Sequence, residues 1–285
     1  VLATDHNATE TGYSKVTPES TIFSSENSCV LTPEVTVGPY CKHAFTPNSL
    51  NSYYPFADIT GEYVRKNVVE YQAGVPITLD YQVVDVDTCD PVSNVYVEIW
   101  HCNATGVYSG IEAPQGGLNA TWLRGIQLTD EDGVAQFDSI FPGHYTGRAT
   151  HIHVLVHSNA TIHPNGTIGQ DNLASHVGQA FFDDSLIAAV EATSPYTSNQ
   201  QILTLNADDH ILAQEADPDG VDPLMQYALL GDDIADGIFA WLSFGINVTA
   251  INEASAAADY YAIGGVANAE ALVVLVPVDL TATLL

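Results

Sequence analysis

Four side chains that could act together in catalysis lie within nine residues, in the segment 141–157 (FPGHYTGRATHIHVLVH). His151 and His153 are separated by one residue, and neutral imidazole is a common ligand of iron, copper, zinc and nickel. Tyr145 adds a phenol oxygen, which is a hard ligand once it is ionised. Arg148 adds a fixed positive charge between the tyrosine and the first histidine. This combination favours a metal site with a cation beside it.

The residues around the two histidines are apolar or β-branched, which predicts a strand over 149–157. Side chains alternate across a strand, so His151 and His153 would project from one face while Ile152 projects from the other. Two ordinary histidines on a polar strand face are the alternative, because His157 continues the same alternation. The triplet alone does not separate the two interpretations, and the nearby tyrosine and arginine favour the metal site.

The net charge disfavours partners that need a basic surface. The 285 residues include 35 Asp or Glu and only 6 Lys or Arg, which gives a formal net charge of −29. Nucleic acid and an anionic membrane surface are therefore not expected partners, because both require a basic footprint. Only Arg124 and Arg148 among the basic residues lie beyond residue 66. That scarcity indicates a function for the arginine beside the histidines.

Cysteine usage and sequons indicate a secreted glycoprotein. The four cysteines form two pairs close in sequence, and we predict the disulfides Cys29–Cys41 and Cys89–Cys102. A cysteine metal site is the alternative, but no Cys-x-x-Cys spacing occurs. No apolar run is long enough to span a bilayer, and the chain is expected to begin after removal of a signal peptide. The six Asn-x-Ser/Thr sequons lie at Asn7, Asn103, Asn119, Asn159, Asn165 and Asn247.

Short strands separated by turn signals predict an all-β fold, a sandwich or barrel of mostly antiparallel strands. The expected strands cover 76–87, 94–101, 123–129, 134–140, 149–157, 178–182, 201–205 and 238–248. Helix is sparse and is expected only over 185–192 and 208–215. We predict three parts: an extended N-terminal arm over 1–70, a catalytic β-sandwich domain over 71–250, and a C-terminal tail over 251–285 packed on or beside the core.

Several further motifs accompany the histidine segment in a fixed order. They are Gly38-Pro39-Tyr40, the stretch 100–110 (WHCNATGVYSG), 124–133 (RGIQLTDEDG), 141–148 (FPGHYTGR) and His151-Ile152-His153. Any one of them is weak, and the first alone reads as an ordinary turn. Together, over roughly residues 29–250, they resemble the intradiol ring-cleavage dioxygenases, especially the secreted fungal members. That family has a β-sandwich fold, in agreement with the strand pattern.

The resemblance implies a non-haem Fe(III) held by two tyrosines and two histidines. Carried over to this sequence, the ligands are Tyr108, Tyr145, His151 and His153. Ferric iron is a hard ion that ionised tyrosines stabilise, and imidazoles complete such a set. The activity implied is cleavage of a small catechol by O2 to a cis,cis-muconic acid. Each imidazole should be fixed through its other ring nitrogen by a partner that the sequence does not identify.

The resemblance also implies roles for residues around the metal. The ligand matching Tyr145 leaves the metal and helps to remove a proton from the catechol. Arg148 matches an arginine that stabilises negative charge developing on the ring, an electrostatic role. Gln179 matches a glutamine beside that arginine. Tyr40, with Gly38 and Pro39, would line the substrate pocket; a packed core tyrosine is the alternative for Tyr40.

Two other classes of function compete with the enzyme. The first is a non-catalytic secreted glycoprotein that binds phenols or a metal on the same sandwich, since fold does not guarantee activity. The second is a zinc or copper hydrolase that uses the two histidines, but no third histidine or carboxylate stands at a familiar spacing. The complete ligand set with Arg148 favours the enzyme. The polar, unpatterned residues 1–70 also argue against the helical dimer segment of the bacterial catechol enzymes.

Overall fold

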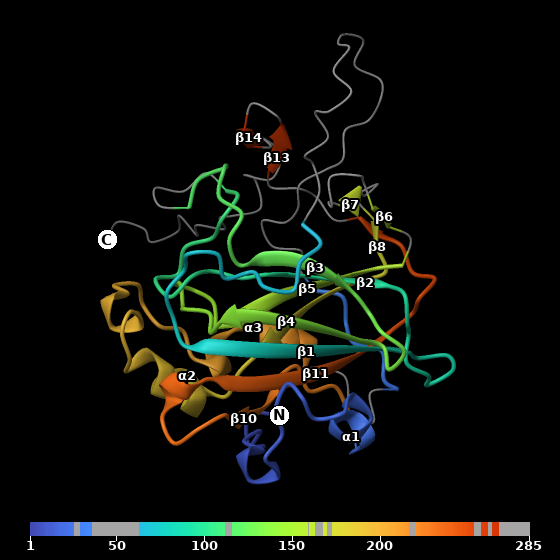
Figure 1. Cartoon of the computed structure of the whole chain (residues 1–285), viewed down its shortest axis with the longest axis horizontal. Helices are drawn as coiled ribbons and strands as arrows, with labels where there is room; N and C mark the ends of the chain where they lie inside the picture. Colours follow the sequence, from blue (N-terminus) through green and yellow to red (C-terminus); the bar gives the residue numbers. More distant parts are fainter. Residues whose placement is uncertain are drawn as a thin grey trace, which may run out of the picture.

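Two four-stranded sheets pack face to face in the computed structural model (Figure 1). It describes residues 1–25, 29–35, 63–111, 116–158, 160–162, 168–169, 173–216, 220–253, 258–261 and 264–267. The first sheet has the order β10 (Gln226–Leu229), β11 (Ile238–Ile246), β1 (Pro76–Asp85) and β4 (Val134–Ile140). The second has the order β3 (Arg124–Leu128), β2 (Tyr96–Trp100), β5 (His151–His157) and β9 (His176–Phe181).

The remaining described elements are short. Strand pairs form between β6 (Thr161–Ile162) and β7 (Ile168–Gly169), β8 (Leu173–Ala174) and β12 (Asn252–Glu253), and β13 (Ala258–Tyr261) and β14 (Gly264–Ala267). The α-helices are α1 (Glu19–Ile22), α2 (Asp184–Glu191) and α3 (His210–Glu215). The 3-10 turns are η1 (Thr9–Thr11), η2 (Phe23–Ser25), η3 (Tyr196–Ser198), η4 (Asn206–Asp208) and η5 (Ile234–Asp236). The predicted all-β sandwich is confirmed, with one parallel ladder, between β1 and β11.

The core lies between the sheets and follows from strand alternation. Alternate residues of β1 point inward and meet alternate residues of β5, and burial of this apolar area stabilises the sandwich by roughly 25 cal/mol per Å². These buried positions are Ile77, Leu79, Tyr81, Val83, Ile152, Val154 and Val156. The opposite face of β5, which carries His151 and His153, is also buried, so the second sheet is covered on both sides.

The first 25 residues lie against the outer face of the first sheet, below β11 and β10 in Figure 1. Ile22 and Phe23 pack there in one cluster with Phe239 and Trp241. His6 is fully buried, with Nδ1 2.7 Å from Asp183 and Nε2 3.1 Å from Asp222. The N-terminal residues therefore belong to the folded body. The division at 70 and 250 stays a prediction, and residues 271–285 lie outside the described part of the chain.

One expected strand is wrong. Residues 201–205 form no ladder, and hydrogen bonds of Gln201 go to the turns that carry Tyr108 and Tyr145. Two of the three apolar residues face solvent, with Ile202 71% and Leu205 49% exposed, and Leu203 packs against the core. The other expected strands and both helices are present with boundaries shifted by a few residues.

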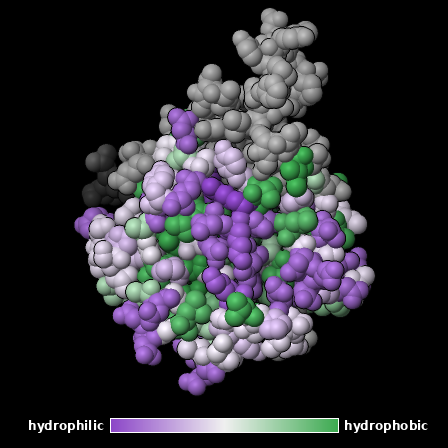
Figure 2. Space-filling view, in the orientation of Figure 1, coloured by the Kyte–Doolittle hydropathy of each residue, from purple (hydrophilic) through white to green (hydrophobic). Residues whose placement is uncertain are grey.

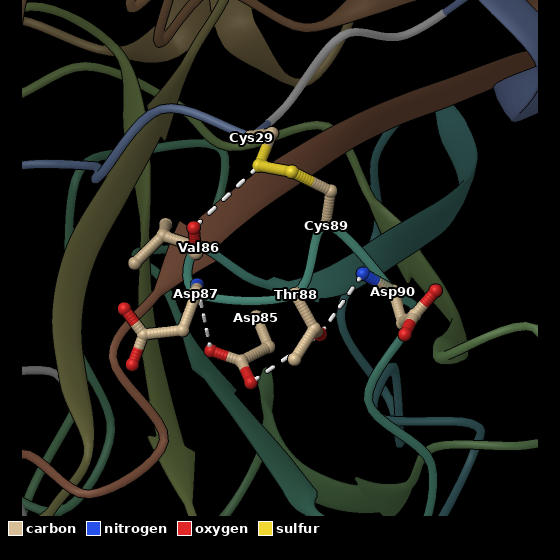
Figure 3. The surroundings of a disulfide bond; sticks show 7 residues. All are labelled: Cys29, Asp85, Val86, Asp87, Thr88, Cys89 and Asp90. Carbon is tan, nitrogen blue, oxygen red and sulfur yellow. Dashed lines mark hydrogen bonds between the residues drawn. A yellow bond between two sulfur atoms is a disulfide. The ribbon is translucent and has the colours of Figure 1, made fainter.

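The predicted disulfide pairing is wrong as well. Cys29 bonds to Cys89, which lies in the turn after β1 (Figure 3). The reason is the path of the arm: Thr32 donates its backbone N–H to the carbonyl of Gly245 on β11, which brings residue 29 beside the end of β1. Cys102 is a buried thiol without a disulfide, and burial raises its pKa to about 12. Cys41 lies outside the described residues.

No helix in the described part of the chain is long and apolar enough to cross a bilayer. The face seen in Figure 2 carries a band of hydrophilic residues between smaller hydrophobic areas. Such a mosaic is normal for a protein surface, since apolar atoms always contribute part of it.

Candidate metal centre

Strand β5 places the two histidines on one face, as its alternation predicts. Their Nε2 atoms lie 3.2 Å apart and both side chains are 1% exposed. The Nδ1 atom of His151 lies 2.6 Å from the carbonyl oxygen of Ala149, so Nδ1 carries the proton and donates it. The Nε2 atom of His151 is thereby left as a lone-pair donor that faces the site. The partner that the sequence could not name for this imidazole is a backbone carbonyl.

Tyr108 reaches the site from the loop that follows β2. The Asn103 side chain organises this loop, because its Oδ1 accepts hydrogen bonds from the backbone N–H groups of Thr105 and Val107. The Tyr108 ring packs edge-on against Trp100 with centroids 4.7 Å apart. Its hydroxyl lies 3.4 Å from Nε2 of His151. The phenol is 6% exposed, so the ring is fixed by packing on the sheet.

Tyr145 reaches the same point from the turn before β5. Tyr145 and Arg148 form an isolated antiparallel bridge, and Gly147 between them has a φ of 93°, a conformation that favours glycine. The Tyr145 hydroxyl lies 3.2 Å from Nε2 of His151. The rings of Tyr108 and Tyr145 meet edge to face with centroids 5.7 Å apart. The four predicted ligands therefore come together from one strand and two turns.

The donor set fits ferric iron. Ligands that share one ion at about 2.0–2.1 Å lie roughly 3 Å apart when they are neighbours, which the 3.2–3.4 Å separations around Nε2 of His151 approach. Two phenol oxygens are hard donors and two imidazoles are intermediate, a combination suited to a hard, redox-active ion. Among the described residues no group of three or more His, Cys, Asp or Glu could hold a metal.

Burial prepares these side chains for metal binding. Desolvation, helped by the charge of Arg148, lowers the pKa of His151 to about 3, and desolvation lowers the pKa of His153 well below its usual range. Both imidazoles are therefore neutral at neutral pH and have lone pairs available. Desolvation also raises the pKa of Tyr108 well above its usual value and that of Tyr145 to about 12. The phenols keep their protons until a cation replaces them.

Two hydrogen-bond partners hold the guanidinium of Arg148 at one side of the site. Its Nε donates to Oδ2 of Asp209 at 2.8 Å, and its guanidinium also donates to Oε1 of Gln179 at 2.6 Å. Gln179 lies on β9 directly opposite His153. The structure thus brings Arg148 and Gln179 together beside the predicted ligands, as expected. Gly38, Pro39 and Tyr40 lie outside the described residues.

Two residues around the site were not expected to contribute. Asp209 accepts from Arg148 and from the backbone N–H of Ala149, and its other oxygen accepts from Ile211 and Leu212, so it caps α3. An Asp before a helix is an N-cap signal that could have marked it. Trp100 supports the rings of Tyr108 and His153. No spacing in the sequence distinguishes it from an ordinary core tryptophan.

The fold and the site agree with comparisons to known proteins. A family model described as "Dioxygenase" matches residues 50–208. An intradiol ring-cleavage dioxygenase from Tetranychus urticae is 28% identical, with a TM-score of 0.59 over 78% of this chain and 97% of that chain. A second solved dioxygenase is 27% identical, with a TM-score of 0.58 over 79% of this chain and 98% of that chain. A search of curated proteins finds no match.

These matches define the class of protein: an oxidoreductase that incorporates O2. The chain belongs to the dioxygenase family, in its intradiol ring-cleaving branch. It is an enzyme of that type.

Proposed function

We propose that this protein holds one non-haem Fe(III) through Tyr108, Tyr145, His151 and His153 and uses O2 to cleave small catechols to cis,cis-muconic acids. The observation that carries the proposal is the meeting of two phenol oxygens with His151 Nε2, at 3.4 and 3.2 Å. Iron held by these residues would supply the Lewis acidity and redox capacity that make a catechol substrate reactive toward O2. The reaction adds both oxygen atoms to the ring carbons and needs no external reductant.

The two tyrosines have different roles because their surroundings differ. Tyr108 is packed against Trp100 in the outer cluster of the second sheet, which suits a ligand that stays in place. Tyr145 is half-buried, whereas Tyr108 is buried, so the Tyr145 side chain has more room to move. We propose that Tyr145 is the ligand that would give up its place to substrate, and that its phenolate oxygen would then accept a proton from an incoming catechol hydroxyl. The proton then stays on a phenol whose pKa burial has raised to about 12.

Arg148 supplies preorganised positive charge. Its hydrogen bonds to Asp209 and Gln179 hold the guanidinium in one orientation before substrate arrives. A fixed donor aimed where negative charge develops lowers a barrier without reorganisation at the moment of reaction. We propose that it stabilises the electron-rich ring during attack by O2, and that Gln179 keeps it in that orientation.

The local charge favours substrates without a ring carboxylate. Arg148 already forms a close ion pair with the buried carboxylate of Asp209. A substrate carboxylate buried beside it would therefore lack an unshared cation and incur an uncompensated desolvation cost. The net charge of −29 adds long-range repulsion. We propose catechol and hydroxyquinol as better substrates than protocatechuate.

Oxygen uptake tests the proposal. Iron-loaded protein should consume O2 with catechol or hydroxyquinol and form a muconic acid that contains both atoms of labelled O2. Arg148→Ala should keep the iron, because arginine is not a ligand, and lose on the order of 10²–10³ in turnover. Colour change on catechol binding without O2 consumption would instead establish a binding protein. A higher kcat/KM for protocatechuate than for catechol would refute the charge argument.

We also propose that the protein passes through the secretory pathway. The Cys29–Cys89 disulfide and the six sequons support this, since disulfides and N-glycans form in the same oxidising compartment. Asn7 and Asn119 are exposed, which makes them the best acceptors, whereas Asn103 and Asn247 are half-buried. Asn159 and Asn165 lie outside the described residues. Secretion would be contradicted if protein from its natural source carried no N-glycan and its Cys29 were reduced.

A further inference from the structure

The segment 199–204, which we call the clamp segment, joins the two turns that carry the tyrosine ligands. It lies between η3 and η4 and forms no strand. Its central residue, Gln201, is exposed to solvent. The clamp segment forms hydrogen bonds to the loop before Tyr108 and to the turn that carries Tyr145.

Gln201 makes both connections with one side chain. Its Nε2 donates to the carbonyl oxygens of Thr105 at 3.1 Å and Gly106 at 3.2 Å, in the loop that leads to Tyr108. Its Oε1 accepts from the backbone N–H of Thr146 at 3.3 Å, next to Tyr145. An amide is suited to this position because it offers a donor and an acceptor on one rigid plane.

Other contacts hold the clamp segment onto the turn of Tyr145. The backbone carbonyl of Gln201 faces Nε2 of His144 at 3.0 Å, and Asn199 donates its amide to the carbonyl of His144 at 2.8 Å. The hydroxyl of Thr204 accepts from the N–H of Gly147 at 3.0 Å. The residues on both sides of Tyr145 are thus bound to one segment.

The two turns also approach each other too closely for a side chain. A Cβ added at Gly106 would lie 2.1 Å from the carbonyl oxygen of His144 and 2.3 Å from Nε2 of Gln201. Gly106 also has a φ of 76°, which favours glycine. The amide of Gln201 therefore lies at a close approach of the two tyrosine-bearing turns.

We propose that Gln201 is a positioning residue that sets the separation of Tyr108 and Tyr145 and so the geometry of the metal site. The effect on metal geometry rests on the proposed iron function. The restraint that Gln201 places on the two turns does not depend on it. The side-chain hydrogen bonds of Gln201 reach only backbone atoms of the two turns, not the donor atoms of the four proposed ligands. It acts through the backbone of the turns, and the ligands themselves provide the binding.

Paired variants test this. Gln201→Ala removes both connections, and Gln200→Ala is the matched control, because Gln200 is an exposed neighbour whose amide reaches only the carbonyls of Ser198 and Asn199. In metal-free protein, hydrogen exchange at the Thr146 amide should be faster by roughly two- to tenfold in Gln201→Ala, the range expected for one lost hydrogen bond. The iron dissociation constant, measured against a competing chelator, should rise by a similar factor. Gln200→Ala should match wild type in both.

A second variant separates the two connections. Gln201→Glu keeps an acceptor for the Thr146 N–H but has no donor for the carbonyls of Thr105 and Gly106. It should protect the Thr146 amide and still bind iron more weakly than wild type. Exchange and iron affinity in Gln201→Ala equal to those in Gln200→Ala would overturn the proposal. Wild-type protein that binds no iron would refute the proposed function alone, and the exchange comparison would still decide whether Gln201 restrains the turns.

Discussion

Replacement of Asp209 by asparagine removes the carboxylate that holds Arg148 and the start of β5. The side chain is fully buried, and Oδ2 accepts from Nε of Arg148 at 2.8 Å and from the N–H of Ala149 at 2.7 Å. The asparagine oxygen can still accept from Ile211 and Leu212 and preserve the cap of α3. Its amide NH2 would then face two N–H donors. The variant therefore isolates the ion pair from the helix cap.

The expected cost is about 3 kcal/mol of unfolding free energy at pH 7. Removal of one partner of a buried ion pair costs about 3–5 kcal/mol because the other charge is left uncompensated. Arg148 keeps its hydrogen bond to Gln179, and its side chain is 13% exposed, so the low end applies. Turnover should also fall, because the guanidinium loses the contact that orients it.

The pH dependence has a definite sign. Burial alone would raise the pKa of Asp209, but Arg148 and the backbone N–H donors outweigh it and lower the pKa below 3.8. The carboxylate therefore makes its full contribution to the unfolding free energy above about pH 3.9, the pKa of an Asp in the unfolded chain. This contribution is lost as pH falls through the lower pKa of the folded protein. The difference between wild type and Asp209→Asn should stay constant from pH 7 to about 4 and shrink below.

Urea unfolding measures both quantities. Asp208→Asn is the matched control, since Asp208 is the exposed neighbour. It should stay within about 0.5 kcal/mol of wild type, as surface substitutions usually do. An unfolding free energy of Asp209→Asn equal to that of Asp208→Asn at pH 7 would refute the assignment of Asp209 as the anchor of Arg148.

Two further variants test the N-terminal arm. Burial alone would lower the pKa of His6, but hydrogen bonds to Asp222 and Asp183 outweigh it and raise the pKa above 6.5. The imidazolium therefore contributes its full share of the unfolding free energy below that unfolded value, and this share is lost as pH rises through the folded pKa. In urea unfolding, the loss of unfolding free energy caused by His6→Gln should decline from pH 5.5 to 9. A loss that grows with pH would contradict this. Cys89→Ser opens a loop of 60 residues. The variant should lose about 4 kcal/mol of unfolding free energy, because the open loop has more conformational entropy in the unfolded state. Non-reducing peptide mapping of the wild type should recover the Cys29–Cys89 peptide pair. A free thiol at Cys89 would contradict the pairing.

The local pattern predicted the elements that bear the histidines. The run of apolar and β-branched residues identified β5, and the two-residue period of a strand put His151 and His153 on one face. The two tyrosines lie in turns, where no periodicity exists. Closeness in sequence to the histidines suggested Tyr145, whereas only the resemblance to a family suggested Tyr108. Proximity of Tyr108 to Tyr145 depends on how two turns meet in space.

The errors have physical causes of the same kind. The apolar residues of 201–205 suggested a strand, but the polar groups of this segment bind two turns instead of a neighbouring strand. Cysteines close in sequence suggested local disulfides, whereas the arm returns Cys29 to the end of β1. Asp209 carries a helix-cap signal, but its contact with Arg148 spans 61 residues of sequence. Long-range pairing of this kind has no local signature.

Iron content together with the visible spectrum tests the central claim most directly. Wild-type protein should bind about one iron per chain and absorb in the visible through charge transfer from tyrosinate to Fe(III). Tyr108→Phe should lose iron or most of that absorption. Tyr71→Phe is the control, because Tyr71 is 75% exposed, and it should leave both unchanged. A colourless iron-free wild type, or full visible absorption in Tyr108→Phe, would contradict the account.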